Sequence, residues 1–437
     1  MPHPPVQKKS DGSKSEGKQP FQSVKGMADL LPKDAPWWRM MTDAARTVSE
    51  LHDFRFIETP IVELANLFES GVGIATDIVE KQMYVFKTKG DDRVALRPEG
   101  TAPVMRSYLE HHLGYFASPL KVFYCGPMFR YERPQEGRYR QFHQWGVEVL
   151  GDGDSIYDGE VILAAMDFLK ALKLKDPLLK INTIGCRVCR PGYRERLKAY
   201  YQERKAKLCK DCERRLQANP LRLLDCKEKG CEELKKDAPI ILDYLCQACN
   251  NHFKTVLELV EDNGISYEPD PYLVRGLDYY NRTVFEIMSG SYPAALGSGG
   301  RYDYLSEQLG GRMVPAVGIA MGLERVMEAL RKEGVVPPQV RSKPAIFFAA
   351  VGEQAKKSSL KIMRELRANG MVVVEALGKR TLKAQLKAAA KSKVPLALLF
   401  GQREMFEGSV ILRNMVTGAQ ETVVLSRLVE EVKKRLR

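Results

Sequence analysis

Arginine side chains are concentrated in the segment from Phe129 to Gln144, whose sequence is FRYERPQEGRYRQFHQ. Arg130 opens this segment, and Arg138 lies near its centre. A guanidinium group is planar and permanently charged, so it can bind two phosphate oxygens at once. An aromatic ring such as Phe142 can stack on a flat base. The segment therefore predicts a site for phosphate groups and a base, and the alternative is a solvated loop that binds nothing specific.

Two stretches of alternating apolar residues, Lys121–Tyr124 and Trp145–Leu150, flank the arginine-rich segment. Alternation with a period of two is typical of strands, so we expect an antiparallel hairpin with a long loop. Further along the chain, Ala316–Arg325 has the pattern of a buried strand that turns into a helix. The other elements expected around these are a helix over Trp37–Leu51 and strands over Arg55–Val62, Val94–Arg97, Tyr272–Val274 and Thr283–Met288, the last followed by a glycine cluster, Gly297–Gly300.

The chain has 437 residues, which is too long for one core, since single cores stop growing near roughly 250–300 residues. Its longest apolar run, about Ala345–Val351, falls far short of the roughly 20 residues that span a bilayer. The N-terminal residues lack the apolar region of a signal peptide, so we expect a cytosolic protein without a membrane segment. The expected parts are a disordered tail over 1–24, a main domain over 25–333 with a cysteine-rich helical insertion over 184–253, a linker over 334–343 and a last domain over 344–437.

The last domain alternates predicted strands and helices, which indicates a small α/β sheet domain. From Lys343 to Arg437 it carries 19 Lys and Arg against 8 Asp and Glu, within a chain of net charge +13. A compact and strongly basic domain favours a polyanionic partner, most simply a nucleic acid. A lysine-rich surface that serves only solubility is the alternative.

Eight of the nine cysteines fall within 64 residues. They form the pairs Cys186/Cys189, Cys209/Cys212, Cys226/Cys231 and Cys246/Cys249. Two sets of four thiolates would be enough for two tetrahedral structural zinc sites. Free thiols, disulfides, a redox cluster and an iron–sulfur cluster are the alternatives, and the spacing does not tell which cysteines share a metal.

Short motifs in a fixed order resemble those of the class II aminoacyl-tRNA synthetases. The hairpin that carries Arg130 and Phe142 is similar to the second motif of these enzymes, and Gly318–Arg325 is similar to the third. The segment Trp37–Pro60 occupies the place of the first motif, which in the family builds the interface of a homodimer.

A second set of motifs resembles signatures of the histidyl-tRNA synthetases, namely Leu273–Glu286, Gly299–Asp303 and Leu96–Thr101. The likeness runs from Gly26 to the C-terminus, with two departures: the sequence GMAD at 26–29 and the cysteine-rich insertion. It implies an α+β fold, in which an antiparallel sheet flanked by helices forms the catalytic domain and the last domain binds the anticodon. The implied reaction is the ATP-dependent ligation of L-histidine to tRNA(His).

The resemblance also assigns the residues that would bind histidine. Neutral imidazole has one donor and one acceptor nitrogen, so a selective pocket needs a carboxylate and hydroxyl groups. Glu148, Tyr280 and Tyr302 would supply the ring contacts, with Tyr279 beside them. The α-amino group would be held by Glu99, Thr101 and Gln144.

The remaining roles concern ATP and catalysis. Arg130 would grip the α-phosphate, and Arg275 would lie on its other side, where other class II enzymes use a metal ion. Glu132 and Arg138 would hold the adenine edge and the β- and γ-phosphates, and Mg²⁺ would accompany the leaving pyrophosphate. Phe142 and Arg325 would sandwich the adenine.

Two other functions fit parts of the sequence. One is a synthetase-like regulatory subunit of ATP phosphoribosyltransferase, which we expect to lack both the Arg275 segment and the basic last domain. The other is a class II ligase for threonine, proline or glycine, against which the segment from Arg275 to Glu286 argues.

Overall fold

The computed structural model describes residues 21–73, 76–338 and 345–436. The chain divides into two compact units, Met1–Pro337 and Pro338–Arg437. Residues 1–20 of the predicted tail and 339–343 of the predicted linker lie outside the described residues, as do the two end positions of the predicted last domain, 344 and 437. Among the described residues, none of the helices combines the length and apolar character needed to cross a bilayer.

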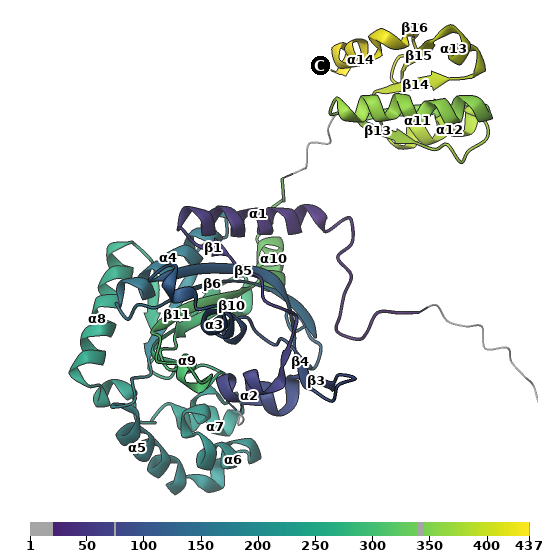
Figure 1. Cartoon of the computed structure of the whole chain (residues 1–437). Coiled ribbons are helices and arrows are strands. Elements are labelled where there is room, and N and C mark those ends of the chain that lie inside the picture. The colour runs from purple at the N-terminus through teal and green to yellow at the C-terminus, as the bar shows by residue number, and fades with distance from the viewer. Residues whose placement is uncertain (1–20, 74–75, 339–344, 437) are drawn as a thin grey trace, which may run out of the picture. The chain divides into compact units, whose positions relative to one another are not determined.

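An eight-stranded sheet forms the centre of the first unit (Figure 1). Its strands are, in spatial order, β1 (Arg55–Phe56), β5 (Leu120–Phe129), β6 (Gln141–Leu150), β11 (Ala316–Gly322), β10 (Tyr292–Arg301), β9 (Asn281–Ser289), β7 (Leu178–Thr183) and β8 (Tyr267–Pro269). The inner neighbours are antiparallel, and only the two edge pairs, β1 with β5 and β7 with β8, are parallel. The predicted antiparallel sheet and the long hairpin, now β5–β6, are therefore confirmed.

Apolar side chains of four helices pack with one set of sheet residues into a continuous core. These helices are α1 (Ala35–Leu51), α4 (Ile156–Ala171), α8 (Gln247–Asp262) and α10 (Leu323–Lys332). Trp145 of β6 is fully buried in this core, and its indole N–H donates to Ser49 Oγ of α1 at 3.0 Å. The helices thus fix the base of the hairpin that carries the arginine-rich loop.

A second core packs α2 (Ala65–Val72), α3 (Thr101–Glu110) and α9 (Leu305–Gln308) with other sheet residues and with the cysteine-rich insertion. A three-stranded sheet comes from the same part of the sequence as α2 and α3. Its strands are, in spatial order, β2 (Val62–Leu64), β4 (Arg93–Leu96) and β3 (Tyr84–Lys87). The insertion follows β7 and contains α5 (Arg190–Glu203), α6 (Lys210–Ala218) and α7 (Lys229–Lys235) before α8 begins.

Two local predictions need correction. Residues 55–62 are not one strand, because the chain leaves the large sheet after Phe56 and enters the small sheet at Val62, with Pro60 between them. Residues 272–274 form no strand, because the Asp270 side chain and backbone oxygens accept from the next N–H groups and close a turn. The glycine cluster follows β9 as predicted, but it lies inside a further strand, β10, which the sequence did not predict and where the neighbouring strands approach closely.

The second unit is a five-stranded sheet with four helices. Its strand order is β13 (Val372–Glu375), β12 (Ala345–Ala350), β14 (Leu396–Phe400), β15 (Ser409–Asn414) and β16 (Gln420–Val424). The helices are α11 (Glu353–Ala368), α12 (Leu382–Lys391), α13 (Gln402–Glu407) and α14 (Leu428–Leu436). The predicted small α/β domain is confirmed, although the sequence patterns did not predict β16 or α13.

Candidate active site

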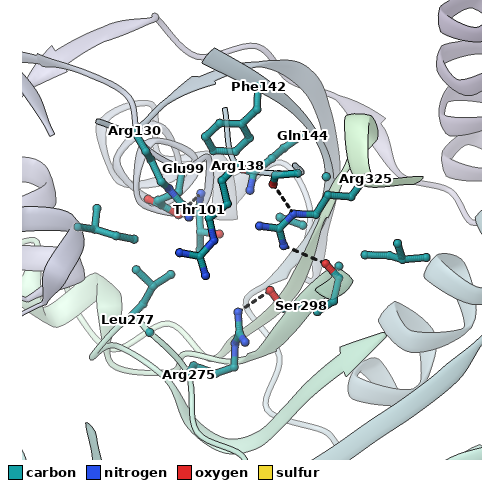
Figure 2. Close-up of a pocket in the computed structure, with 18 of the residues that line it drawn as sticks. Glu99, Thr101, Arg130, Arg138, Phe142, Gln144, Arg275, Leu277, Ser298 and Arg325 are labelled. Carbon is teal, nitrogen blue, oxygen red and sulfur yellow. Dashed lines mark hydrogen bonds between the residues drawn. The ribbon is translucent and has the colours of Figure 1, made fainter. Parts of the chain in front are cut away.

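A cavity with about 920 Å³ of empty space opens among the ends of β5, β6, β10 and β11. Eleven of the residues predicted to bind ligands line it: Glu99, Thr101, Arg130, Glu132, Arg138, Phe142, Gln144, Arg275, Tyr279, Tyr280 and Arg325. They come from four separate stretches of the sequence. Figure 2 shows Arg130 and Arg275 on different walls of this space, with Arg138 reaching between them.

Arg130 follows the last residue of β5 and is held by the backbone. Its Nε donates to the carbonyl of Pro98 at 2.8 Å, and its guanidinium lies 5.2 Å from the centre of the Phe142 ring. The Arg138 Nε lies 3.6 Å from a carboxylate oxygen of Glu132 within the same loop. The loop therefore presents its charged groups to the cavity as a connected set.

Arg275 enters from the opposite wall. Its guanidinium donates to Ser298 of β10 (Figure 2). It also donates to Glu286 of β9, and the two bonds together fix its position. Burial has the largest single influence on the pKa of Arg275 and lowers it, but the Glu286 carboxylate and the nearby Tyr280 and Tyr279 hydroxyls outweigh burial and raise the pKa. Arg275 thus stays charged inside the protein.

Arg325, at the start of α10, connects two walls. Its Nε donates to the carbonyl of Gly137 at 3.0 Å, and Nη1 donates to the carbonyl of Ala295 at 2.9 Å. Both acceptors lie beside the cavity. The edge of the guanidinium is thus engaged by the backbone, which leaves its flat face for stacking.

Below the arginines lies a floor of carboxyl and hydroxyl groups. Glu99 accepts hydrogen bonds from the N–H groups of Thr101 at 2.8 Å and Ala102 at 2.9 Å, at the start of α3. Glu148 is fully buried and accepts from Thr101 Oγ1 at 2.7 Å and from the Tyr302 hydroxyl at 2.6 Å. Glu148 and Tyr302 are not among the cavity-lining residues, and they contact the cavity through Thr101.

Burial decides the protonation of this floor. It raises the pKa of Glu148 to about 8, and the charge of Glu99 adds to the rise, while the hydrogen bonds from Tyr302 and Thr101 oppose it. Burial also raises the pKa values of Tyr279, Tyr280 and Tyr302, so these hydroxyl groups stay protonated near neutral pH. The floor can therefore both donate and accept hydrogen bonds.

The sequence did not point to Tyr124, Leu277, Ser298 or Glu324, which also line the cavity. Tyr124 had one usable signal, because it pairs with Gly146 in the hairpin register. A side chain at Gly146 would collide with the Tyr124 ring, so the glycine makes room for it. Single residues in the other strands carry no comparable signal.

The eight paired cysteines lie outside this cavity and form two groups of four. One group contains Cys186, Cys189, Cys246 and Cys249, and the other contains Cys209, Cys212, Cys226 and Cys231. Within each group all sulfur atoms lie within 4.8 Å of one another. The Cys186–Cys189 and Cys209–Cys226 sulfur separations are 3.7 and 3.8 Å. Four sulfurs at roughly 2.3 Å from a tetrahedral ion would lie about 3.8 Å apart, so either group could hold a metal ion.

A family model described as histidyl-tRNA synthetase matches residues 26–326, which include every wall of the cavity. The chain belongs to this family. A second model, described as anticodon binding domain, matches residues 345–435. Both matches agree with the resemblance found in the sequence motifs.

Relatives of known identity cover nearly the whole chain. The histidine–tRNA ligase of Thermosipho melanesiensis is 47% identical over 402 residues, which are 92% of this chain and 95% of the relative. That of Halothermothrix orenii is 44% identical over 416 residues, 94% of this chain and 99% of the relative. Among solved structures, the apo histidyl-tRNA synthetase of S. aureus superposes with a TM-score of 0.76 at 34% identity, covering 94% of this chain and all of that chain.

Proposed function

We propose that this chain is a histidine–tRNA ligase that uses the cavity for both steps of its reaction. The carboxylate of L-histidine attacks the α-phosphorus of ATP, which gives histidyl-adenylate and pyrophosphate. The 3′-hydroxyl of the terminal adenosine of tRNA(His) then attacks the histidyl carbonyl, an ester forms and AMP leaves. The names of the relatives support a ligase and not the regulatory-subunit alternative. Arg130 and Arg275 support it from the geometry, since they enter one cavity from two walls above a polar floor.

In this proposal the arginines position ATP and stabilise charge on its α-phosphate. Arg130 binds one side of the α-phosphate and Arg275 the other, because charge developing there is stabilised best by donors that are already in place. Arg138 binds the β- and γ-phosphates, and Glu132 accepts from the adenine edge. Phe142 and the free face of Arg325 enclose the adenine ring. Mg²⁺ that enters with ATP would neutralise part of the charge of the pyrophosphate.

Histidine binds at the floor. Glu99 accepts from the α-amino group, and Thr101 and Gln144 complete its surroundings. Tyr279 and Tyr280 line the ring pocket, and Glu148 with Tyr302 forms its base. A pocket built from such paired polar groups rejects apolar amino acids by roughly 10⁴–10⁵, because its own groups would otherwise stay unpaired.

The second unit would bind the anticodon of tRNA(His), as the description of its matching model suggests. Basic side chains on its surface would contact tRNA phosphates. We also propose a homodimer, since apolar side chains are exposed on the short strands near the first motif. They are Phe56, Val62, Leu64, Val85 and Phe86. A cytoplasmic location completes the proposal, because the clustered thiols would stay reduced there.

Each group of four cysteines would bind one Zn²⁺. The sulfur separations suit a tetrahedral ion, and four thiolates without an open position are typical of structural zinc. None of the eight cysteines lines the cavity. The zinc ions would therefore support the fold and take no part in the chemistry.

Pyrophosphate exchange tests the ligase and the role of Arg275 together. We expect ATP–pyrophosphate exchange by the wild-type protein with histidine and with no other amino acid. Arg275→Ala should lower the exchange rate by roughly 10²–10³, because it removes a preorganised positive charge from beside the α-phosphate. Arg275→Lys keeps the charge without the planar fork and should recover part of the rate. Wild-type protein that exchanges with no amino acid, or best with another one, contradicts the proposed function.

A further inference from the structure

The stretch 275–282 carries Arg275, Tyr279 and Tyr280, yet it has almost no regular structure of its own. Helix and strand are absent from 275 to 280, and β9 begins only at Asn281. Irregular backbone is held in place by whatever packs against it, since it lacks the hydrogen-bond ladders of helices and sheets. The contacts of this stretch therefore determine how well the site is formed.

The outer cysteine group, which is Cys186, Cys189, Cys246 and Cys249, contacts one end of the stretch through the backbone. The carbonyl of Gly185, next to Cys186, accepts from the N–H of Arg282 at 2.9 Å. The N–H of Ile184 donates to the carbonyl of Arg282 at 2.7 Å. These two bonds join the first cysteine pair directly to the start of β9.

Arg190 adds a side-chain contact from the same cysteine pair. It follows Cys189 and opens α5. Its Nη2 donates to the carbonyl of Tyr280, and its Nε donates to the carbonyl of Ile184 at 3.1 Å. One guanidinium thus bridges the cysteine loop and the backbone of a proposed histidine-binding residue.

The inner cysteine group, which is Cys209, Cys212, Cys226 and Cys231, contacts the other end. Asn219 lies between Cys212 and Cys226 in the sequence, and its Nδ2 donates to the Asp278 carboxylate at 2.9 Å. Arg222 is only 5% exposed, and its Nη1 donates to the carbonyl of Arg275 at 3.5 Å. The chain between these cysteines therefore supports the part of the stretch that holds Arg275.

A small cavity of about 30 Å³ lies where these contacts converge. Arg190 lines it from the outer group, Asn219 and Arg222 line it from the inner group, and Arg275, Asp278 and Tyr280 line it from the stretch. The space beneath the stretch is thus enclosed by both cysteine groups. Loosening of either group would leave this backbone with fewer partners.

We infer that zinc at the two cysteine groups braces residues 275–282 from both ends and thereby sets the affinity of the site for histidine. A cation would stabilise sulfur atoms this close together as thiolates, because uncompensated thiolates repel one another and thiols bind each other only weakly. Zinc binding to four such thiolates supplies folding free energy to the segments that carry them. Arg190, Asn219 and Arg222 are positioning residues in this arrangement. The inference deepens the proposed histidine activation and rests on it.

The first test combines zinc analysis, hydrogen exchange and kinetics on the full-length protein. The double variants Cys186→Ser/Cys189→Ser and Cys209→Ser/Cys212→Ser should each lose one of two zinc ions per chain. Each should speed hydrogen exchange across 275–282 and raise the KM for histidine about 10-fold, with less effect on the KM for ATP. Cys125→Ser is the matched control, because Cys125 lies in β5 outside both groups, and it should change none of these values.

A second test covers the case in which the cysteine variants fail to fold. Arg190→Ala keeps all eight cysteines, so it should keep both zinc ions while it raises the KM for histidine and speeds hydrogen exchange at 279–282. Arg190→Lys should recover part of the effect, because a lysine can reach one of the two carbonyl groups. The exposed Arg196, farther along α5, provides the control Arg196→Ala.

Two results would overturn the inference: wild-type protein without zinc, or loss of zinc with unchanged hydrogen exchange at 275–282 and unchanged KM for histidine. Failure of the proposed function looks different. In that case zinc-loaded wild-type protein shows no histidine-dependent pyrophosphate exchange. Loss of zinc still speeds hydrogen exchange at 275–282, so the brace is tested separately.

Discussion

Glu148 is the residue whose chemistry is most altered by the fold. Its hydrogen-bond partners are the hydroxyl groups of Thr101, Tyr124 and Tyr302, and no cation pairs with it among the described residues. Burial places its pKa at about 8, against an ordinary value of 4.5. Near neutral pH the carboxyl group therefore exists in both forms, so it can donate a hydrogen bond as well as accept one.

The stability of the protein should depend on this carboxyl group. In the unfolded chain Glu148 ionises near its ordinary pKa, whereas in the folded protein it holds its proton up to about pH 8. Its contribution to folding is thus fully present below the ordinary pKa and is lost as the pH rises through about 8. Glu148→Gln cannot ionise, so its thermal midpoint relative to wild type should rise between about pH 5.5 and about pH 8.5.

Thermal unfolding at these two pH values measures the effect. Glu258→Gln is a suitable control, because the Glu258 side chain is 55% exposed on α8 and should follow the wild-type curve. Equal pH dependence of wild type and Glu148→Gln would contradict the assignment of a raised pKa.

The residues that line the cavity were predictable from the sequence where they occur in dense motifs. Arg130, Arg138 and Phe142 lie in one loop, and Arg275, Tyr279 and Tyr280 lie in one segment. The partners of each cysteine pair were not predictable, because the first pair joins the fourth and the second joins the third. That choice depends on how α5 to α8 fold back, and spacing along the chain does not contain it.

At the scale of elements, β9, β10 and β11 form one wall of the cavity. They can pack this closely because the middle strand, β10, is rich in glycine. Gly299 of β10 faces the carbonyl of Gly318 and the ring of Phe285 so closely that no side chain fits. The neighbouring strands can therefore approach, and Ser298 is brought to Arg275. Alternating apolar residues predicted β9 and β11, but they could not predict a strand rich in glycine.

Gly299→Ala should force these strands apart. A methyl group there would lie 2.8 Å from Phe285 Cζ and 2.9 Å from Ile319 Cα, neither of which can move without the sheet. We expect a loss of roughly 1–3 kcal/mol in the free energy of unfolding, together with slower histidine-dependent exchange. Denaturant unfolding measures the first and pyrophosphate exchange the second. Gly290→Ala is the control, because nothing lies within 4 Å of a side chain at that position. Equal effects of the two substitutions would show that the methyl group at position 299 does not separate the strands.

At the scale of the whole molecule, positive charge is unevenly divided between the two units. The second unit carries much of the net charge of +13, and Lys379, Arg380 and Lys383 are exposed at the start of α12. These three residues lie within the part of the chain that matches the anticodon binding domain model. Composition alone therefore indicated a polyanionic partner, whereas the identity of that partner required the motifs of the other unit.

Neutralising these three residues should weaken tRNA binding without affecting the first step. We expect a higher KM for tRNA in aminoacylation. A plot of log affinity against log salt concentration should also become less steep, by about one unit for each phosphate that the protein no longer neutralises. Histidine-dependent pyrophosphate exchange should stay at the wild-type rate, since the cavity lies in the first unit. Neutralising the exposed Lys357 and Lys361 of α11 shows whether net charge alone accounts for the change. An unchanged salt slope in the triple variant would exclude these residues from the tRNA interface.

The nested pairing of the cysteines also bears on what a break in the chain would do. The outer group takes two of its sulfurs from each end of the insertion, so residues 190–245 form a loop that is closed at its base. With zinc in place, a protease that cuts within this loop leaves two polypeptides that share at least one ion. Such a nicked protein would keep its mass in solution, because β6 still pairs with β11 and β7 with β9, and a chelator or an oxidant that removes the metal would loosen only the insertion. A cut in the backbone of this region therefore need not break up its folded structure.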